Sequence, residues 1–204
     1  MKITWYGHSC FGVETESASV VFDPYAPGKV PGLELPPLSA DAVISSHEHT
    51  DHYYPPAVKQ LRRRVDIPMT RIETFHDDAL GQKRGLNTVT VVELGGLRAA
   101  HLGDLGHELS AEQLEGLGKL DVLMIPVGGY YTINSAQARA TADALKSFVT
   151  IPMHYRGEGF GFDVISTVDE FAALSPDSVF WESSVLELSE IKMPSTVIMK
   201  CPIK

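Results

Sequence analysis

The sequence contains very little cysteine and no long apolar run, and each absence narrows what the chain can be. Two cysteines, Cys10 and Cys201, lie near opposite ends of the 204 residues, so we predict neither a disulfide framework nor a cysteine-based zinc module. No apolar run approaches the roughly 18 residues that a transmembrane helix needs, and no charged segment followed by an apolar stretch opens the chain. We therefore expect a cytoplasmic protein without membrane association.

The sequence also lacks a basic block, because its formal net charge is −9 at pH 7 and its one basic run is the short segment 62–64. A protein that binds RNA or DNA mainly by neutralising phosphates presents a broad basic face, so nucleic acid is not an expected partner. A solvated helix end explains the basic run more simply.

The composition is that of a globular protein. Hydrophobic residues make up 44% of the chain and charged residues 21%, unlike a disordered or fibrous sequence. No linker, repeat or low-complexity tract divides the chain, so we predict a single domain spanning residues 1–204.

Short runs rich in aromatic and β-branched residues alternate with helical stretches, and His and Asp collect where the predicted strands end. This arrangement predicts an α/β fold with a site along one sheet edge. A loop rich in proline spans residues 25–37. The predicted strands are 3–6, 10–14, 19–22, 42–45, 88–94, 97–102, 122–127, 150–153, 185–188 and 197–200, and the predicted helices are 55–64, 136–148 and 168–174.

The run HEHTDH at residues 47–52 places three imidazoles and a carboxylate in six residues. In a tight turn, His47 and His49 point to one side while Asp51 and His52 come round behind them, so one segment can serve two adjacent ions. Imidazole and carboxylate without thiolate suit zinc, iron or manganese. A polar surface turn is the alternative, but clustered imidazoles repel one another when protonated and lose hydrogen bonds when buried.

These residues match the HxHxDH signature of the metallo-β-lactamase superfamily, which the chain resembles. Within that superfamily it is similar to the bacterial branch that includes L-ascorbate-6-phosphate lactonase. The resemblance implies a four-layer αββα sandwich in one domain. The further motifs that carry it are WYGHS at 5–9, FHDD at 75–78, HLGD at 101–104, VGG at 127–129 and IPMHY at 151–155.

Carried over to these positions, the resemblance implies a site for two divalent metal ions, with Zn²⁺ expected and Mn²⁺ or Fe²⁺ as alternatives. Asp104 would bridge the two ions, and a dinuclear metal-bound hydroxide would attack the substrate. Asp51 and Asp104 are the predicted catalytic residues, with Asp51 accepting a proton. The implied ligands are His47, His49 and His76 for one ion, and Asp51, His52 and His154 for the other.

Several further residues are candidates for supporting roles. His8 and His101 could orient ligands or shuttle protons, or could be satisfied structural histidines. Arg156 could bind an anionic substrate, with packing as the alternative. For His107 we favour a structural role over substrate binding.

The predicted function is metal-dependent hydrolysis of a small molecule. A sugar-phosphate lactone is the first candidate substrate, and the substrate could carry an anionic group. A phosphodiester or a small ester is the alternative substrate, and a non-catalytic metal-binding sensor or scaffold is the alternative class. The absence of a cysteine ligand disfavours hydrolysis of β-lactams, and histidine at position 49 disfavours di-iron redox chemistry. A homo-oligomer is an open option, since no sequence feature requires an interface.

Overall fold

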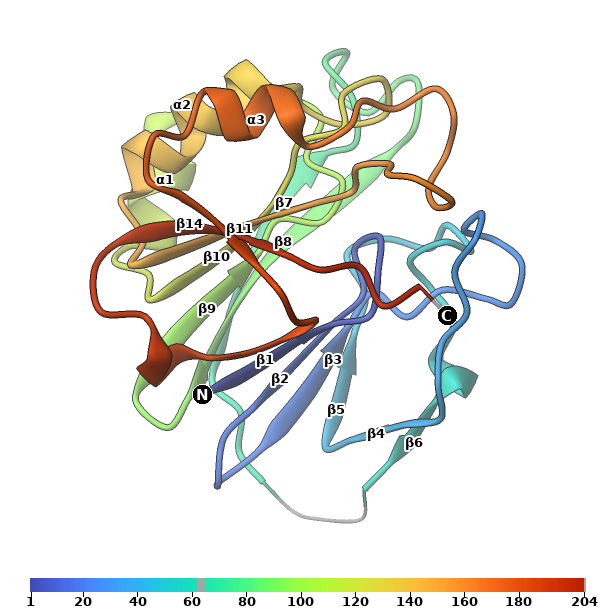
Figure 1. Cartoon of the computed structure of the whole chain (residues 1–204), viewed down its shortest axis with the longest axis vertical. Coiled ribbons are helices and arrows are strands. Elements are labelled where there is room, and N and C mark those ends of the chain that lie inside the picture. The colour runs from blue at the N-terminus through green and yellow to red at the C-terminus, as the bar shows by residue number, and fades with distance from the viewer. Residues whose placement is uncertain (62–64, 204) are drawn as a thin grey trace.

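The computed structural model describes residues 1–61 and 65–203, and two β-sheets form its centre (Figure 1). The smaller of the two has the strand order β13-β1-β2-β3-β5, in which β3 and β5 run parallel and the other neighbours are antiparallel. Burial alternates along β1 and β2, so these strands present one face to the core. The bounds are β1 Lys2–Trp5, β2 Phe11–Glu14, β3 Ser19–Phe22, β5 Ala42–Ile44 and β13 Val185–Glu187.

The larger sheet has seven strands in the order β12-β14-β11-β10-β9-β8-β7. Strands β12, β14, β11, β10 and β9 run parallel, whereas β8 pairs antiparallel with both β9 and β7. Every residue of β10, β11 and β14 is buried, because both faces of these strands are covered. The bounds are β7 Met69–Phe75, β8 Leu86–Leu94, β9 Leu97–His101, β10 Val122–Pro126, β11 Val149–Met153, β12 Ser178–Trp181 and β14 Ser195–Met199.

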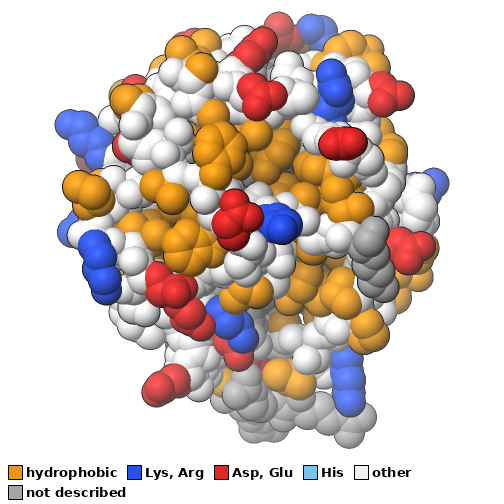
Figure 2. All heavy atoms as spheres, viewed as in Figure 1, with side chains coloured by type: hydrophobic (Ala, Val, Ile, Leu, Met, Phe, Trp, Pro, Cys, Tyr) orange, Lys and Arg blue, Asp and Glu red, His pale blue; other side chains and the backbone are white. Residues whose placement is uncertain are grey.

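The α-helices of the described residues lie on the outer face of the seven-stranded sheet (Figure 1). They are α1 Ala111–Leu117, α2 Ser135–Leu145 and α3 Asp169–Ala173. Capping boxes built on Ser110 and Asn134 satisfy free backbone N–H groups at the starts of α1 and α2. Among residues 1–61 and 65–203, no helix is long and apolar enough to cross a membrane. On the face drawn in Figure 2, acidic and basic side chains are interspersed among the described residues.

An aromatic cluster at the core reaches the edge where the two sheets meet. The Trp5 ring contacts Phe11, Tyr155 and Phe160 with centroid distances of 6.3, 5.3 and 6.2 Å. Its indole N–H donates to the carbonyl of His8 at 2.9 Å, which satisfies a buried donor. The core therefore anchors the segment that carries His8.

The strand directions gather polar residues at one edge of the molecule. Strands β9, β10 and β11 are parallel, and β7 points the same way as β9 because β8 is antiparallel to both. Strands β3 and β5 are parallel to each other in the facing sheet. The carboxyl ends of parallel strands are where open α/β sheets collect functional residues. Residues that follow these ends include Asp23, His47, His76, Asp104 and His154.

The predicted helix at 55–64 is wrong in its described part. Residues Pro55–Ala57 form one 3-10 turn, η1, and Val58–Gln60 continue as β6, which pairs in parallel with β4, Leu38–Ala40. The two prolines suit a helix start, but Val58 is buried and extended, so tertiary pairing overrides the local signal. Residues 62–64, with the basic run, lie outside the described residues. The described part of this segment thus contains η1 and β6 where a helix was expected.

Candidate metal centre

The turn after β5 brings the HEHTDH residues together. The backbone N–H groups of His52 and Tyr53 both donate to the carbonyl of His49, at 2.9 and 2.7 Å. The hydroxyl of Ser45 donates to the carbonyl of His52 at 2.9 Å and closes the turn from the strand side. One short segment therefore presents four candidate ligands in a fixed arrangement.

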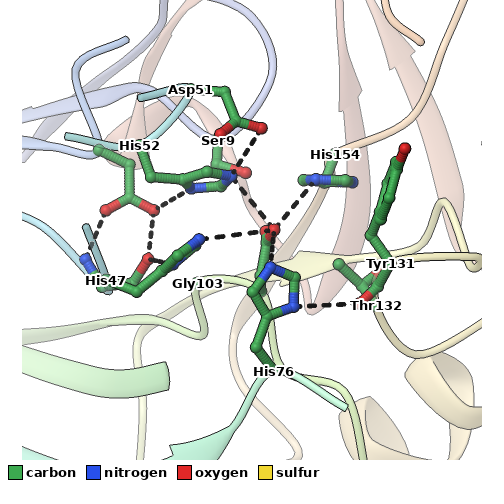
Figure 3. A network of polar contacts seen from close by, with 12 residues as sticks. Ser9, His47, Asp51, His52, His76, Gly103, Tyr131, Thr132 and His154 are labelled. Atoms are coloured by element: carbon green, nitrogen blue, oxygen red, sulfur yellow. Dashed lines mark hydrogen bonds and ion pairs between the residues drawn. The ribbon is translucent and has the colours of Figure 1, made fainter. Parts of the chain in front are cut away.

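The candidate ligands of the described chain fall into two groups, in each of which the ligand atoms lie within 4.8 Å of one another. A third set, His47, His52 and Asp104, meets the same limit and links the two groups. Figure 3 shows how the side chains of His47, Asp51, His52, His76 and His154 converge. We name the two groups by their solvent access: the open group is His47, His49 and His76, and the closed group is His8, Asp51, His52 and His154.

Asp104 lies between the groups. Its Oδ2 atom is 3.1 Å from the Nε2 of His76, 3.2 Å from that of His52, 3.3 Å from that of His154 and 4.0 Å from that of His47. A single carboxylate oxygen thus faces imidazoles of both groups. This is the position that a ligand shared by two ions would occupy.

Several buried polar atoms of this centre have no hydrogen-bond partner in the described chain. An unsatisfied buried nitrogen or oxygen is costly, and such an atom calls for an explanation such as an ion. The donor set of imidazole and carboxylate without thiolate fits zinc, iron or manganese, so these residues fit a pair of divalent ions. The atoms are both ring nitrogens of His8, the Nε2 atoms of His47 and His52, Oδ1 of Asp104 and Nδ1 of His154.

Asp23 orients two of the imidazoles. It follows β3, is fully buried, and its Oδ2 lies 2.7 Å from the Nδ1 of His52. The same carboxylate accepts the backbone N–H and the hydroxyl of Ser46 at 2.7 Å each, and that hydroxyl is 2.9 Å from the Nδ1 of His47. Both rings therefore direct Nε2 into the centre. Carboxylates behind the histidine ligands of metal sites fix ring orientation in the same way. Sequence reasoning missed Asp23, whose only local signal is a carboxylate directly after a predicted strand.

Asn87 and Gly103 hold the backbone of Asp104. The side-chain oxygen of Asn87 accepts the backbone N–H of Asp104 at 2.9 Å. Gly103 has φ of +56°, and a Cβ there would lie 2.3 Å from this oxygen and 2.4 Å from Ser46. A glycine is therefore required for the close approach. On the far side, Nδ1 of His76 is 3.2 Å from the carbonyl of Tyr131, which leaves Nε2 facing Asp104.

His8 and His154 are tied to each other. Both have left-handed backbones, with φ of 52° and 55°, a region that few residues other than glycine adopt. The N–H of His154 donates to the carbonyl of His8 at 3.3 Å, and their ring centroids are 4.1 Å apart. A Cβ at Gly128 would lie 2.0 Å from the carbonyl of His154, so this packing also needs a glycine. His8 thus lies beside the predicted ligands, within the closed group.

The other candidate residues lie outside both groups. Nε2 of His101 is 2.8 Å from the carbonyl of Ser9, while Nδ1 accepts the N–H of Gly103. Nε2 of His107 accepts the N–H of Phe75, a structural contact. The Nε of Arg156 donates to a backbone carbonyl at 2.8 Å.

Burial and mutual charge shape the electrostatics of the centre. Burial lowers the pKa of His8 to about 4 and, with neighbouring His52, lowers the pKa of His47 to about 3. Both rings are therefore neutral at pH 7 and can donate a lone pair. Burial also lowers the pKa of His52, but the carboxylates of Asp104 and Asp23 raise it well above its ordinary value. The raised pKa means that His52 holds a proton when no ion is bound. An ion bound to His52 would displace this proton.

A pocket of about 340 Å³ opens onto the centre. Its size suits a small molecule. It contains residues from both groups together with two cations and two aromatic rings that the sequence did not single out as a set. The lining residues are His49, Asp51, His76, Lys83, Arg84, Asp104, Tyr131 and Phe162.

Comparison with known proteins shows which family the chain belongs to. A model described as the beta-lactamase superfamily domain matches residues 2–154. The chain belongs to the metallo-β-lactamase superfamily. It is 32% identical over 187 residues to a UPF0173 protein of Pyrococcus abyssi, covering 79% of this chain and 86% of that one, which places it in the UPF0173 family of the superfamily. A UPF0173 metal-dependent hydrolase of Archaeoglobus fulgidus is 29% identical over 194 residues, covering 76% and 83%.

A solved structure confirms the metallo-β-lactamase fold. A Thermotoga maritima protein, assigned to the zinc-dependent hydrolases of the metallo-β-lactamase superfamily, superposes with a TM-score of 0.79. It is 38% identical, and the match covers 98% of each chain. The predicted α/β fold class is thereby confirmed. The individual ligand roles in this member of the superfamily stay predictions.

Proposed function

We propose that this chain is a hydrolase that uses two divalent metal ions, with zinc as the favoured metal, to cleave a small molecule. The observation that carries the proposal is the position of Asp104 Oδ2 among imidazoles of both groups, beside a pocket of small-molecule size. The name of the Archaeoglobus fulgidus relative and the assignment of the Thermotoga maritima structure support it.

The two groups would hold one ion each, and Asp104 would bridge them. His47, His49 and His76 would hold the first ion, and Asp51, His52 and His154 the second, beside His8. Bound ions would supply a water of lowered pKa and would polarise a carbonyl or phosphoryl oxygen. Imidazole and carboxylate donors suit Zn²⁺, with Mn²⁺ and Fe²⁺ as alternatives.

Asp51 would accept and release a proton. It lines the pocket, and its side chain is 24% exposed, unlike the buried imidazoles around it. Burial raises the pKa of Asp51, but His8 and His52 more than offset this and hold it below its usual range. The carboxylate is therefore ionised at neutral pH and can accept a proton and pass it to a leaving group.

The pocket favours an enzyme over a metal-binding sensor or scaffold. A structural metal site is closed by its protein ligands, whereas His49, Asp51 and Asp104 here line an open cavity. The first candidate substrate is a sugar-phosphate lactone, and a phosphodiester or a small carboxylic ester is the alternative.

The test is hydrolysis by protein loaded with Zn²⁺ or Mn²⁺, assayed on 6-phosphoglucono-δ-lactone, bis(4-nitrophenyl) phosphate and 4-nitrophenyl butyrate. We expect two ions per chain and turnover of one substrate class that Asp104→Ala abolishes. Turnover that persists in Asp104→Ala with full metal content would remove this residue from the centre. Two tightly held ions without turnover on any bond type would favour the sensor or scaffold.

A further inference from the structure

The loop that follows His76 is built around one carboxylate. Asp77 is buried, and its Oδ1 accepts the backbone N–H groups of Ala79 and Gly81 at 2.8 and 2.9 Å. Its Oδ2 accepts those of Lys83 and Arg84 at 2.9 and 2.8 Å. One side chain thus satisfies four N–H groups and fixes the course of the loop.

The loop is also closed at its base. The N–H of His76 donates to the carbonyl of Gly85 at 3.0 Å, and the N–H of Gly85 donates to Gly81 at 2.9 Å. Leu80, Gly81 and Gly85 have φ of 56°, 79° and 88°, so the loop makes tight left-handed turns. It therefore starts and ends against a predicted metal ligand.

The two cations that this loop carries differ in whether a carboxylate pairs with their charge. Lys83 Nζ is 2.6 Å from the carboxylate of Asp78, so its charge is paired. The guanidinium of Arg84 forms no hydrogen bond or ion pair within residues 1–61 and 65–203, and lies 5.3 and 6.0 Å from the ring centroids of Tyr131 and Tyr130. Aromatic faces orient a guanidinium without consuming its five N–H donors.

Arg84 lines the same pocket as the open side of the metal centre. The lining of that pocket also includes Asp104 and the ring of Phe162, which meets Tyr131 edge to face at 6.1 Å. A small molecule that reaches the centre would therefore pass an oriented, half-buried guanidinium and two aromatic rings. A guanidinium matches the oxygens of a phosphate or carboxylate in two parallel hydrogen bonds.

We propose that Arg84 binds a phosphate or carboxylate group of the substrate, away from the bond that is cleaved, and that Asp77 positions it. The inference rests on the proposed hydrolase function and narrows the substrate to an anionic small molecule. Because Lys83 is paired with Asp78, it contributes less than Arg84 to binding of this anionic group.

The direct test is equilibrium binding of glucose 6-phosphate and of glucose to the zinc-loaded protein, measured by calorimetry. We expect glucose 6-phosphate to bind more tightly than glucose, and Arg84→Ala to weaken its binding by about 10- to 100-fold without changing zinc content. Arg84→Lys should recover part of the loss, since it keeps the charge but not the planar fork. An unchanged dissociation constant in Arg84→Ala, or no binding by the wild type, would overturn the proposal.

The matched control is Lys119→Ala. Lys119 is an exposed cation in the turn before β10, at the opposite end of the strand from the metal centre. Removing it makes the net charge of −9 more negative by the same single unit, and we expect the dissociation constant for glucose 6-phosphate to stay within about twofold of wild type. An equal loss in both variants would reduce the Arg84 effect to general electrostatics and contradict a specific contact.

A double-mutant cycle tests the positioning role of Asp77. Asn at position 77 offers one acceptor oxygen, so two of the four N–H groups lose their partner. We expect Asp77→Asn to weaken glucose 6-phosphate binding in the wild type but to have no further effect in the Arg84→Ala background. Equal losses in both backgrounds would show that Asp77 does not act through Arg84.

The binding test separates this inference from the proposed function. Glucose 6-phosphate has no bond that the enzyme must cleave, so its binding does not depend on turnover. An active enzyme whose phosphate binding ignores Arg84 would refute the inference alone. An inactive, zinc-loaded protein that binds glucose 6-phosphate through Arg84 would refute the proposed hydrolysis and keep the anion site.

Discussion

The open and closed groups contain similar donors but reach solvent through different side chains, an exposed imidazole in one and a partly exposed carboxylate in the other. His49 of the open group is exposed and lines the pocket with His76. In the closed group His8, His52 and His154 are each at most 1% exposed, and of this group Asp51 alone lines the pocket. Donor chemistry would therefore favour the same metals in both groups, whereas burial would distinguish their roles. We infer that the closed group anchors an ion and that the open group exchanges ligands with solvent and substrate.

The largest effect is expected from the residue that both groups share. Asp104→Ala removes the oxygen that faces four imidazoles, so both ions should bind weakly. We expect activity to fall on the order of 1,000-fold, more than the 10- to 100-fold typical of residues behind the ligands. Metal analysis after gel filtration and kcat/KM on the best substrate measure this. Retention of either ion at full occupancy would show that the groups do not depend on a common bridge.

A pair of substitutions, one in each group, should empty the two positions separately. His154→Ala should leave a single ion in the open group, and His49→Ala should leave a single ion in the closed group. Replacing zinc by cobalt and recording the visible spectrum of each variant distinguishes the remaining site. Two tightly held ions in His154→Ala would mean that His154 is not a ligand.

A smaller effect is expected behind the closed group. Asp23→Asn keeps the shape of the side chain but removes the charge that directs His52 and Ser46. We expect the affinity for the closed-group ion to fall by about 10- to 100-fold, with a smaller loss at the open group, whose His47 Asp23 reaches only through Ser46. Competition with a zinc-binding dye gives both affinities. An equal loss at the two sites would indicate that Asp23 supports the whole edge.

The smallest difference is one of rate. Because His49 is exposed and the closed imidazoles are buried, a chelator should remove one ion per chain quickly and the second more slowly. The release of zinc from the wild type, followed with an indicator dye, should have two phases of equal amplitude. Release in a single phase would contradict different solvent access.

The sequence predicted the parts of the molecule that local pattern determines. The run at 47–52 concentrates ligands in one turn, and the buried strands β3, β10 and β11 carry strong apolar signals. Both edge strands of the seven-stranded sheet, β7 and β12, were missed, because edge strands keep exposed polar or mixed residues. The short strand β6 was taken for helix, since its pairing with β4 is set by tertiary contact.

The supporting residues of the centre could not be predicted for a related reason. Asp23 and Asn87 contact predicted ligands that are 29 and 17 residues away in sequence, and no local sequence pattern predicts contacts over such separations. Arg156 attracted attention because it follows His154 closely, yet its Nε bonds the backbone. Arg84 has no motif around it, and only the fold of the loop brings it to the pocket.

The predicted ligands come from both sheets, and bound ions would therefore have a consequence for stability. His47 and His52 follow a strand of the five-stranded sheet, whereas His76, Asp104 and His154 follow strands of the seven-stranded one. Bound ions would therefore cross-link the two sheets at one edge. Joining residues so far apart in sequence restricts the unfolded chain as a long-loop disulfide does. In a chain with two cysteines and no disulfide among its described residues, metal would provide the cross-link that covalent chemistry does not.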